Sequence, residues 1–335
     1  MTPTAPVRAP SLADILAARE RIAPHVLRTP LIRLRGVEAG RGAQAGDDRQ
    51  IWLKLENLQP TGSFKMRGAA NAMAALAPAE LSRGVYTASA GNMAQGVAWN
   101  ARTRRVPARI IVPDHAPANK LRAIEALGGT VIKLPFDRWW DVLVANGSAE
   151  EQGQFIHPFC NRDVIAGNGT IGLEIVEDLP DVDTVIVPYG GGGLSTGIAI
   201  AVRAQRPDAK VYACEVETAA PLAASLDAGE PVTIDYVPSF VDGIGSRSVM
   251  PAMWSLVIAA LTGSLVVSLQ EIEEALRRLF SAHRVVAEGA GASSVAAALA
   301  SPDLGRRVVC VVSGGNINPD VLARIVANDQ GPVPV

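Results

Sequence analysis

Residues 54–69 read KLENLQPTGSFKMRGA and form the most informative stretch of this chain. Pro60 and Gly62 interrupt regular structure and residues 66–76 then read as a helix, so Lys65 stands at a helix start. A cation there opposes the positive end of the helix dipole, which disfavours a purely stabilising role. The dipole and partial burial together predict an amine pKa below the ordinary value of about 10.4, and a better nucleophile toward a carbonyl. The alternative is an ordinary solvated lysine.

Short β-branched runs alternate with amphipathic segments along the rest of the chain. The predicted strands cover residues 108–113, 130–135, 184–190, 210–217, 264–269 and 306–315, and predicted helices cover 93–102 and 118–127. Near-continuous apolar strands are typical of a parallel α/β sheet that is buried on both faces. Ligands of such sheets bind beyond the carboxyl ends of the strands.

Composition excludes several classes of partner. The 335 residues are enough for two domains, and 31 Lys plus Arg against 33 Asp plus Glu leave a formal charge of −2. Without a basic surface, we expect no nucleic-acid or membrane partner. Neither a membrane-spanning run nor a signal peptide is recognisable, so a cytoplasmic location is expected. Three cysteines without CxxC spacing, at 160, 214 and 310, are expected to be buried thiols.

The clearest candidate binding loop is a run of four glycines. Gly190, Gly191, Gly192 and Gly193 follow a predicted strand and open a helix. Backbone N–H groups and a helix N-terminus can then converge on one phosphate. The run matches neither the Walker pattern nor GxGxxG followed by an acidic ribose ligand. A tight packing turn is the alternative.

Two further strand ends carry small polar residues. Residues 87–92 read TASAGN, and their hydroxyl, amide and N–H groups suit a carboxylate held near a reacting carbon. Residues 311–316 read VVSGGN and place Ser313 before two glycines. For both loops, an N-cap or a turn is the alternative explanation.

Taken together, SFK, SAGNxxQG, GGGGL and SGGN, in this order and spacing, resemble the fold-type II pyridoxal-phosphate enzymes. Within that family the chain is most similar to threonine/serine ammonia-lyases (threonine dehydratases) and serine racemases, over residues 15–326. The segments PHVLRTPL (24–31), FIHPF (155–159), AGNGTIGLEI (166–175) and AEGAGA (287–292) belong to the same pattern.

The resemblance implies a fold like that of tryptophan synthase β. Two open, mostly parallel sheets flanked by helices would place the cofactor, pyridoxal 5′-phosphate, in the cleft between two domains. Residues 1–82 plus 158–335 would form the large cofactor-binding domain, and residues 83–157 the small substrate-side domain. A homo-oligomer, most simply a homodimer, is also implied.

Site residues follow from the same resemblance. Lys65 would hold the cofactor as a Schiff base and remove the substrate Cα proton. The other implied cofactor ligands are Phe64 beside the ring, Asn92 at the ring hydroxyl, Gly190, Gly191, Gly192 and Gly193 at the phosphate, and Ser313 at the pyridine nitrogen. The implied ligands of the substrate carboxylate are Ser89, Gly91, Asn92 and Gln95.

The implied reaction is β-elimination from a β-hydroxy α-amino acid, L-threonine or L-serine, to a 2-oxo acid and ammonia. A neutral hydroxyl at Ser313 cannot hold the ring nitrogen protonated as a carboxylate would, which favours prompt loss of the β-hydroxyl. Racemases of the family typically carry a serine where Ala90 stands, and a methyl cannot exchange a proton. Racemisation, a different hydroxyamino acid, and a non-catalytic phosphometabolite-binding protein are the alternatives.

Some positions depart from the family pattern. Met93 replaces a common histidine and Asn168 a common glutamine, while Trp139 and Trp140 occupy a segment that can face the substrate. These changes predict a more apolar pocket for a bulkier β-substituent. The alternative is that the tryptophans only pack between the domains.

We expect no metal. Glu215 matches one carboxylate of a cation site found in some relatives, but Ala220 or Pro221 stands where the second would be, and a hard cation needs several oxygen ligands. The histidines at 25, 115, 157 and 283 lack ligand spacing and are expected to be structural. The chain has no length for an additional regulatory domain after its last predicted strand, so feedback inhibition is not expected.

Overall fold

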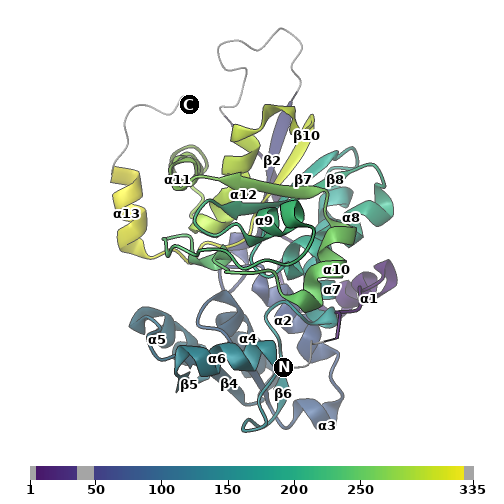
Figure 1. The fold of residues 1–335 in the computed structure, drawn as a ribbon. Helices are drawn as coiled ribbons and strands as arrows, with labels where there is room; N and C mark the ends of the chain where they lie inside the picture. Colours follow the sequence, from purple (N-terminus) through teal and green to yellow (C-terminus); the bar gives the residue numbers. More distant parts are fainter. Residues whose placement is uncertain (1–4, 36–48, 328–335) are drawn as a thin grey trace.

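The computed structural model describes residues 5–35 and 49–327, which build two lobes around two separate β-sheets (Figure 1). The large lobe holds a six-stranded sheet in the order β1-β2-β10-β7-β8-β9, and the small lobe a four-stranded sheet in the order β5-β4-β3-β6. β1 runs antiparallel to β2, and the other pairings are parallel. The predicted fold class is therefore confirmed.

The strands are β1 (Leu31–Arg33), β2 (Gln50–Leu55), β3 (Val85–Ala88), β4 (Ala108–Pro113), β5 (Thr130–Leu134), β6 (Gln154–Phe155), β7 (Thr184–Pro188), β8 (Lys210–Val216), β9 (Gly263–Val267) and β10 (Arg307–Val312). Most predicted strands end one to three residues later than the observed ones. β7 and β10 stop at Pro188 and Val312, because the small residues that follow turn away from the sheet to form loops.

The helices of the large lobe are α1 (Leu12–Ile22), α2 (Lys65–Ala74), α7 (Arg162–Asp178), α8 (Gly193–Gln205), α9 (Pro221–Ala228), α10 (Pro251–Ala260), α11 (Leu269–His283), α12 (Gly289–Ala300) and α13 (Pro319–Ala327). Those of the small lobe are α3 (Pro78–Leu81), α4 (Asn92–Arg104), α5 (Ala118–Ala126) and α6 (Phe136–Val144). Short 3₁₀ turns are η1 (Glu56–Leu58), η2 (Asp242–Ile244) and η3 (Pro302–Leu304).

The central strands of the large sheet are buried on both faces, and β10 shows how. Val308, Cys310 and Val312 point to a core shared with α11 and α12, whereas Val309 and Val311 point to a core shared with α7 and α8. Successive side chains of a strand face opposite sides, so a strand between two helical layers must be apolar throughout. This explains the unbroken apolar run that the sequence shows there.

Helix α2 lies at the junction of the two lobes (Figure 1). Its residues Ala69 and Met73 belong to the core of the small lobe, together with Met93 and Val97 of α4. The helix begins one residue before the predicted start, at Lys65 itself. The first residue of α2 is thus held where the lobes meet.

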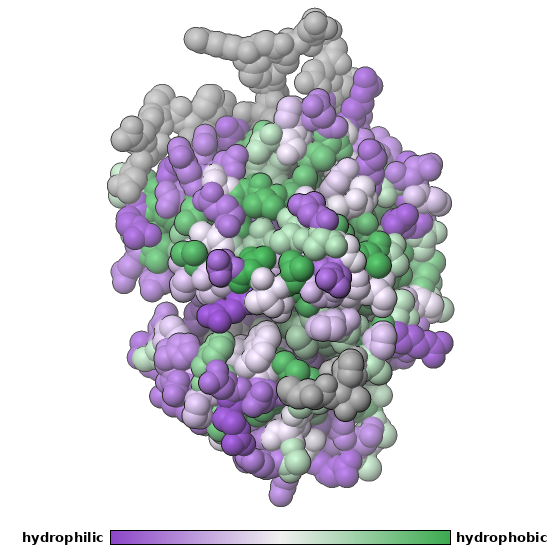
Figure 2. All heavy atoms as spheres, in the orientation of Figure 1, coloured by the Kyte–Doolittle hydropathy of each residue, from purple (hydrophilic) through white to green (hydrophobic). Residues whose placement is uncertain are grey.

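The strands of the small sheet all come from residues 85–155, and those of the large sheet from the chain before and after. On this basis we keep the division into domains 1–82 plus 158–335 and 83–157 as a proposal, although α3, just before the boundary at residue 82, packs against the small lobe. Hydrophilic residues are spread over both lobes on the face seen in Figure 2. Among the described residues, no helix is both long enough and apolar enough to cross a bilayer.

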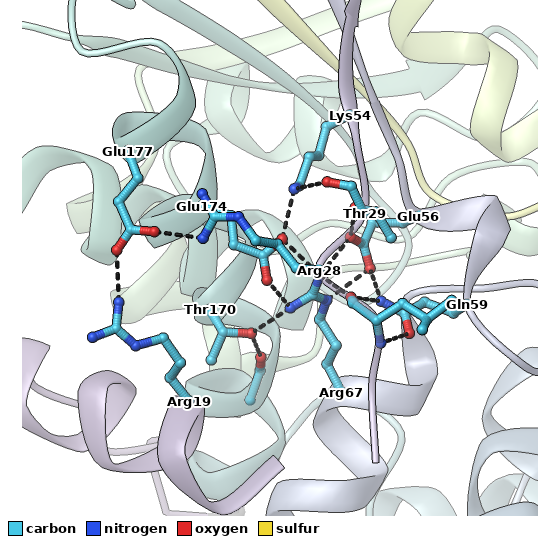
Figure 3. Close-up of polar contacts among 12 residues, drawn as sticks. Arg19, Arg28, Thr29, Lys54, Glu56, Gln59, Arg67, Thr170, Glu174 and Glu177 are labelled. Atoms are coloured by element: carbon cyan, nitrogen blue, oxygen red, sulfur yellow. Dashed lines mark hydrogen bonds and ion pairs between the residues drawn. The ribbon is translucent and has the colours of Figure 1, made fainter. Parts of the chain in front are cut away.

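A buried ionic network anchors α2 to the large lobe (Figure 3). The Arg67 guanidinium, 1% exposed, donates to both carboxylate oxygens of Glu56 at 2.8 and 2.9 Å, and to those of Glu174 at 2.7 and 2.9 Å. Lys54 Nζ donates to the second oxygen of Glu174 at 2.6 Å and to the Thr29 carbonyl at 2.6 Å. Two cations therefore face two carboxylates.

The balance of charge keeps this network ionised. Burial alone would raise the pKa of the Glu56 carboxyl, but the charge and hydrogen bonds of Arg67 outweigh it, and the pKa lies below its ordinary value. Removing one member would leave the others charged and unpaired in a buried site, which is more costly than losing an exposed ion pair.

We therefore expect Arg67→Met to lower the free energy of unfolding by about 3–5 kcal/mol. Arg138→Met is the matched control, because the Arg138–Glu150 pair is 60% and 73% exposed and such pairs contribute at most about 1 kcal/mol. Urea denaturation monitored by circular dichroism measures both. Equal losses of unfolding free energy in the two variants would contradict the proposed role of Arg67 in anchoring α2.

Candidate active site

A cavity with a volume of about 400 Å³ lies between the lobes and is lined by residues of both. Its walls include the loops that follow β3, β7 and β10, as expected for ligand sites beyond the carboxyl ends of parallel strands. Every site residue predicted from the sequence lines this one cavity: Phe64, Lys65, Ser89, Gly91, Asn92, Gln95, Gly190, Gly191, Gly192, Gly193 and Ser313. The topology thus brings together residues nearly 250 positions apart.

Lys65 reaches the cavity from the first turn of α2. The loop before it is fixed to the end of β10, because Phe64 N donates to the Ser313 carbonyl at 2.9 Å and Gly315 N to the Gly62 carbonyl at 2.9 Å. Lys65 Nζ donates to the Pro158 carbonyl at 2.8 Å. Burial lowers the pKa of the amine to about 8, against the opposing charge of Glu288, and this confirms the predicted direction.

The glycine loop leads directly into a helix. Helix α8 begins at Gly193, and Gly192 has a φ of +86°, a conformation that favours glycine. The first N–H groups of a helix lack intrahelical partners and attract anions. Close packing also requires glycine in this loop, as the alternative of a tight packing turn predicts. A Cβ on Gly191 would lie 2.2 Å from the Phe159 ring.

The loop after β3 holds its shape through local hydrogen bonds. Gly91 N donates to Ser89 Oγ at 3.2 Å, and Gly91 rather than Asn92 is the N-cap of α4, without a side-chain cap. A simple N-cap therefore does not explain Asn92. Its amide instead donates to Glu288 Oε1 at 2.8 Å and accepts from Asn316 Nδ2 at 2.8 Å.

Glu288 is a site residue that sequence reasoning did not single out. It precedes α12 and lies against the cavity, 9% exposed. Burial, reinforced by the charge of Asp242, raises the pKa of its carboxyl to about 7. The family segment AEGAGA (287–292) contains Glu288 and could have pointed to it. A carboxylate just before a helix, however, is usually interpreted as an ordinary helix cap.

Glu215 sits elsewhere, at the start of α9. Its two carboxylate oxygens accept from Leu222 N and Ala223 N at 2.8 Å each, and one also accepts from Ser264 Oγ at 2.7 Å. Its carboxylate thus caps the N-terminus of α9. Within residues 5–35 and 49–327 no group of three His, Cys, Asp or Glu side chains is arranged for a metal.

His157 and two of the three cysteines are buried in the protein interior. His157 Nδ1 accepts from Phe159 N at 3.2 Å and Cys160 N at 2.9 Å, and burial lowers the pKa of the ring to about 3. Cys214 and Cys310 are buried as predicted, whereas Cys160 is only partly buried. His115 lines the cavity and is exposed.

The α/β fold brings a buried amine and a glycine-rich helix N-terminus into one cavity, and these are groups that can hold a phosphorylated aldehyde cofactor. A protein-family model described as "Pyridoxal-phosphate dependent enzyme" matches residues 22–314. The chain belongs to this family and uses pyridoxal phosphate as its cofactor.

The comparisons also give particular relatives. The "L-threonine ammonia-lyase" of Thermotoga maritima is 41% identical over 94% of this chain and 78% of that protein. The solved structure of maize serine racemase aligns with a TM-score of 0.86 and 32% identity, covering 95% of this chain and 97% of that one. The processed form of threonine deaminase isoform 2 from Solanum lycopersicum aligns with a TM-score of 0.84 and 30% identity, covering 97% of this chain and 96% of that one.

Proposed function

We propose that the protein is an ammonia-lyase that removes water from a β-hydroxy α-amino acid, with L-threonine and L-serine as its simplest substrates. The observation that carries the proposal is a buried amine, with a pKa lowered to about 8, in the same cavity as a glycine-rich helix N-terminus. The 41% identity to an L-threonine ammonia-lyase supports it. We also propose, from family resemblance, a cytoplasmic homodimer.

The donors around the cavity suit the cofactor. The Lys65 amine would bond to its aldehyde as a Schiff base, and the N–H groups of residues 190–193 would bind its phosphate. Phe64, whose ring centroid lies 5.1 Å from Lys65 Nζ, would pack beside its ring. The neutral Ser313 hydroxyl would hydrogen-bond the pyridine nitrogen, and the second amide hydrogen of Asn92 would meet the ring hydroxyl.

The residues around the cavity would have separate roles in the elimination reaction. When bound, the cofactor withdraws electrons from the substrate Cα and makes its proton removable. Once the substrate amine has taken its place on the cofactor, the freed, neutral Lys65 amine would accept that proton, while Ser89, Gly91, Asn92 and Gln95 would hold the substrate carboxylate. The β-hydroxyl would leave as water with the proton removed from Cα, and the released enamine would take up water to give a 2-oxo acid and ammonia.

Racemisation is the subordinate alternative. Ala90 lines the cavity, and its methyl group can neither donate nor accept a proton. A racemase needs a proton donor on the face of Cα opposite the base. We therefore propose elimination as the main reaction.

We expect the cofactor-loaded protein to form a 2-oxo acid from L-threonine or L-serine, and the remaining substrate to keep its configuration. Lys65→Ala should lower kcat by at least about 10³-fold, because a general base is typically worth about 10² to 10⁴ and the substitution also removes the covalent anchor. Coupled assays of the 2-oxo acid measure kcat for the wild type and for Lys65→Ala, and chiral chromatography measures the configuration of the remaining substrate. Loss of configuration without 2-oxo acid would favour the racemase instead.

A second prediction concerns the phosphate loop. Gly192→Ala places a side chain at a φ of +86°, with its Cβ 3.1 Å from Val257, a strain of about 1–2 kcal/mol that the loop relieves by moving. The Kd for pyridoxal phosphate should rise about tenfold. Gly229→Ala is the control, since Gly229 has a φ of +78° outside the cavity with nothing within 4 Å. Equal Kd values for both variants would speak against a phosphate site at this loop.

A further inference from the structure

One helix presents its apolar side to the cavity. Phe136, Trp139, Trp140 and Leu143 of α6 are spaced i, i+3, i+4 and i+7, which places them on a single helical face. All four line the cavity. Such a stripe normally packs entirely into a core. Because this one faces a cavity, we expect an apolar part of a ligand to bind against it.

The stripe runs from the mouth of the cavity toward the reacting amine. Phe136 at one end is 42% exposed, whereas Leu143 at the other end is 3% exposed. The Leu143 backbone lies beside the His157 ring, and Pro158, the next residue, accepts the hydrogen bond from Lys65 Nζ. A substrate whose Cα lies at Lys65 would extend its side chain along this face.

The aromatic members form a continuous surface. Ring centroids lie 5.8 Å apart for His115 and Phe136, 5.6 Å for Phe136 and Trp139, and 6.2 Å for Trp139 and Trp140. We call these four residues the aromatic wall. The two tryptophans also pack on the core beneath the small sheet, with Val142 and Leu143, so the small lobe holds them in place while they line the cavity.

Two of the charged side chains that line the cavity form an ion pair with each other. Lys120 Nζ forms an ion pair with the Asp242 carboxylate across the two lobes, and both residues line the cavity. Lys65 and Glu288 belong to the proposed cofactor region. An uncharged, planar side chain therefore complements the wall better than a charged one, since aromatic rings bury a large area and prefer offset or edge-to-face neighbours.

We propose that the aromatic wall binds the β-substituent of the substrate, and that β-aryl β-hydroxy α-amino acids are preferred over threonine and serine. This inference rests on the proposed function and specifies its substrate class. The methyl of threonine covers little of such an aromatic surface, while a phenyl group covers much of it. Apolar pockets discriminate by about 10- to 200-fold for as little as one methylene.

The test compares kcat/KM for L-threo-3-phenylserine, L-threo-3-hydroxyleucine and L-threonine in the cofactor-loaded enzyme. We expect phenylserine to exceed threonine at least tenfold, with hydroxyleucine between them. Trp140→Ala should reduce this ratio at least tenfold by lowering kcat/KM for phenylserine. Trp99→Ala, a tryptophan of the same lobe that does not line the cavity, should leave the ratio unchanged.

Binding of unreactive analogues gives a readout that does not depend on turnover or on the folding of a variant. L-Phenylalanine and L-alanine lack the β-hydroxyl, and the wild-type enzyme should bind phenylalanine at least tenfold more tightly. Equal binding, or threonine as the better substrate, would overturn the wall as a specificity element while leaving the lyase intact. No 2-oxo acid from any substrate, with phenylalanine still preferred, would instead overturn the proposed function alone.

Discussion

The buried guanidinium of Arg67 is the interaction on which the geometry of the site depends. It stands two residues after Lys65 and is held by Glu56 and Glu174 of the large lobe, while the next turns of α2 pack into the core of the small lobe. Charges buried in this way tolerate little displacement, because any separation leaves them unpaired. The amine is therefore fixed at the junction where the loops after three strands converge.

The same burial sets the chemistry of the cavity. Desolvation lowers the pKa of Lys65 to about 8 and raises the pKa of Glu288 to about 7. Both groups are thus brought toward neutrality from opposite directions, as is common where protons are transferred. Asn92 connects the Glu288 carboxylate to Asn316, so the orientation of its amide is determined by two partners.

Most of the fold and of the site residues could be predicted from the sequence, because these residues lie in strand–loop–helix units with a local sequence pattern. Lys65, the glycine run and Ser313 each follow a recognisable break, and parallel topology brings them together. The buried network could not be predicted, since Lys54, Arg67 and Glu174 look like surface charges until the fold pairs residues 120 positions apart. Glu288 was missed for the same reason, because its shifted pKa comes from tertiary burial.

Attachment of the cofactor to Lys65 can be measured directly. The purified enzyme is reduced with sodium borohydride, digested and mapped by peptide mass spectrometry. The chain has only four other lysines, Lys54, Lys120, Lys133 and Lys210, so the attachment point can be assigned without ambiguity. We predict the mass of a phosphopyridoxyl group on the peptide that contains Lys65. The same mass on another lysine, or on none, would show that Lys65 does not carry the cofactor.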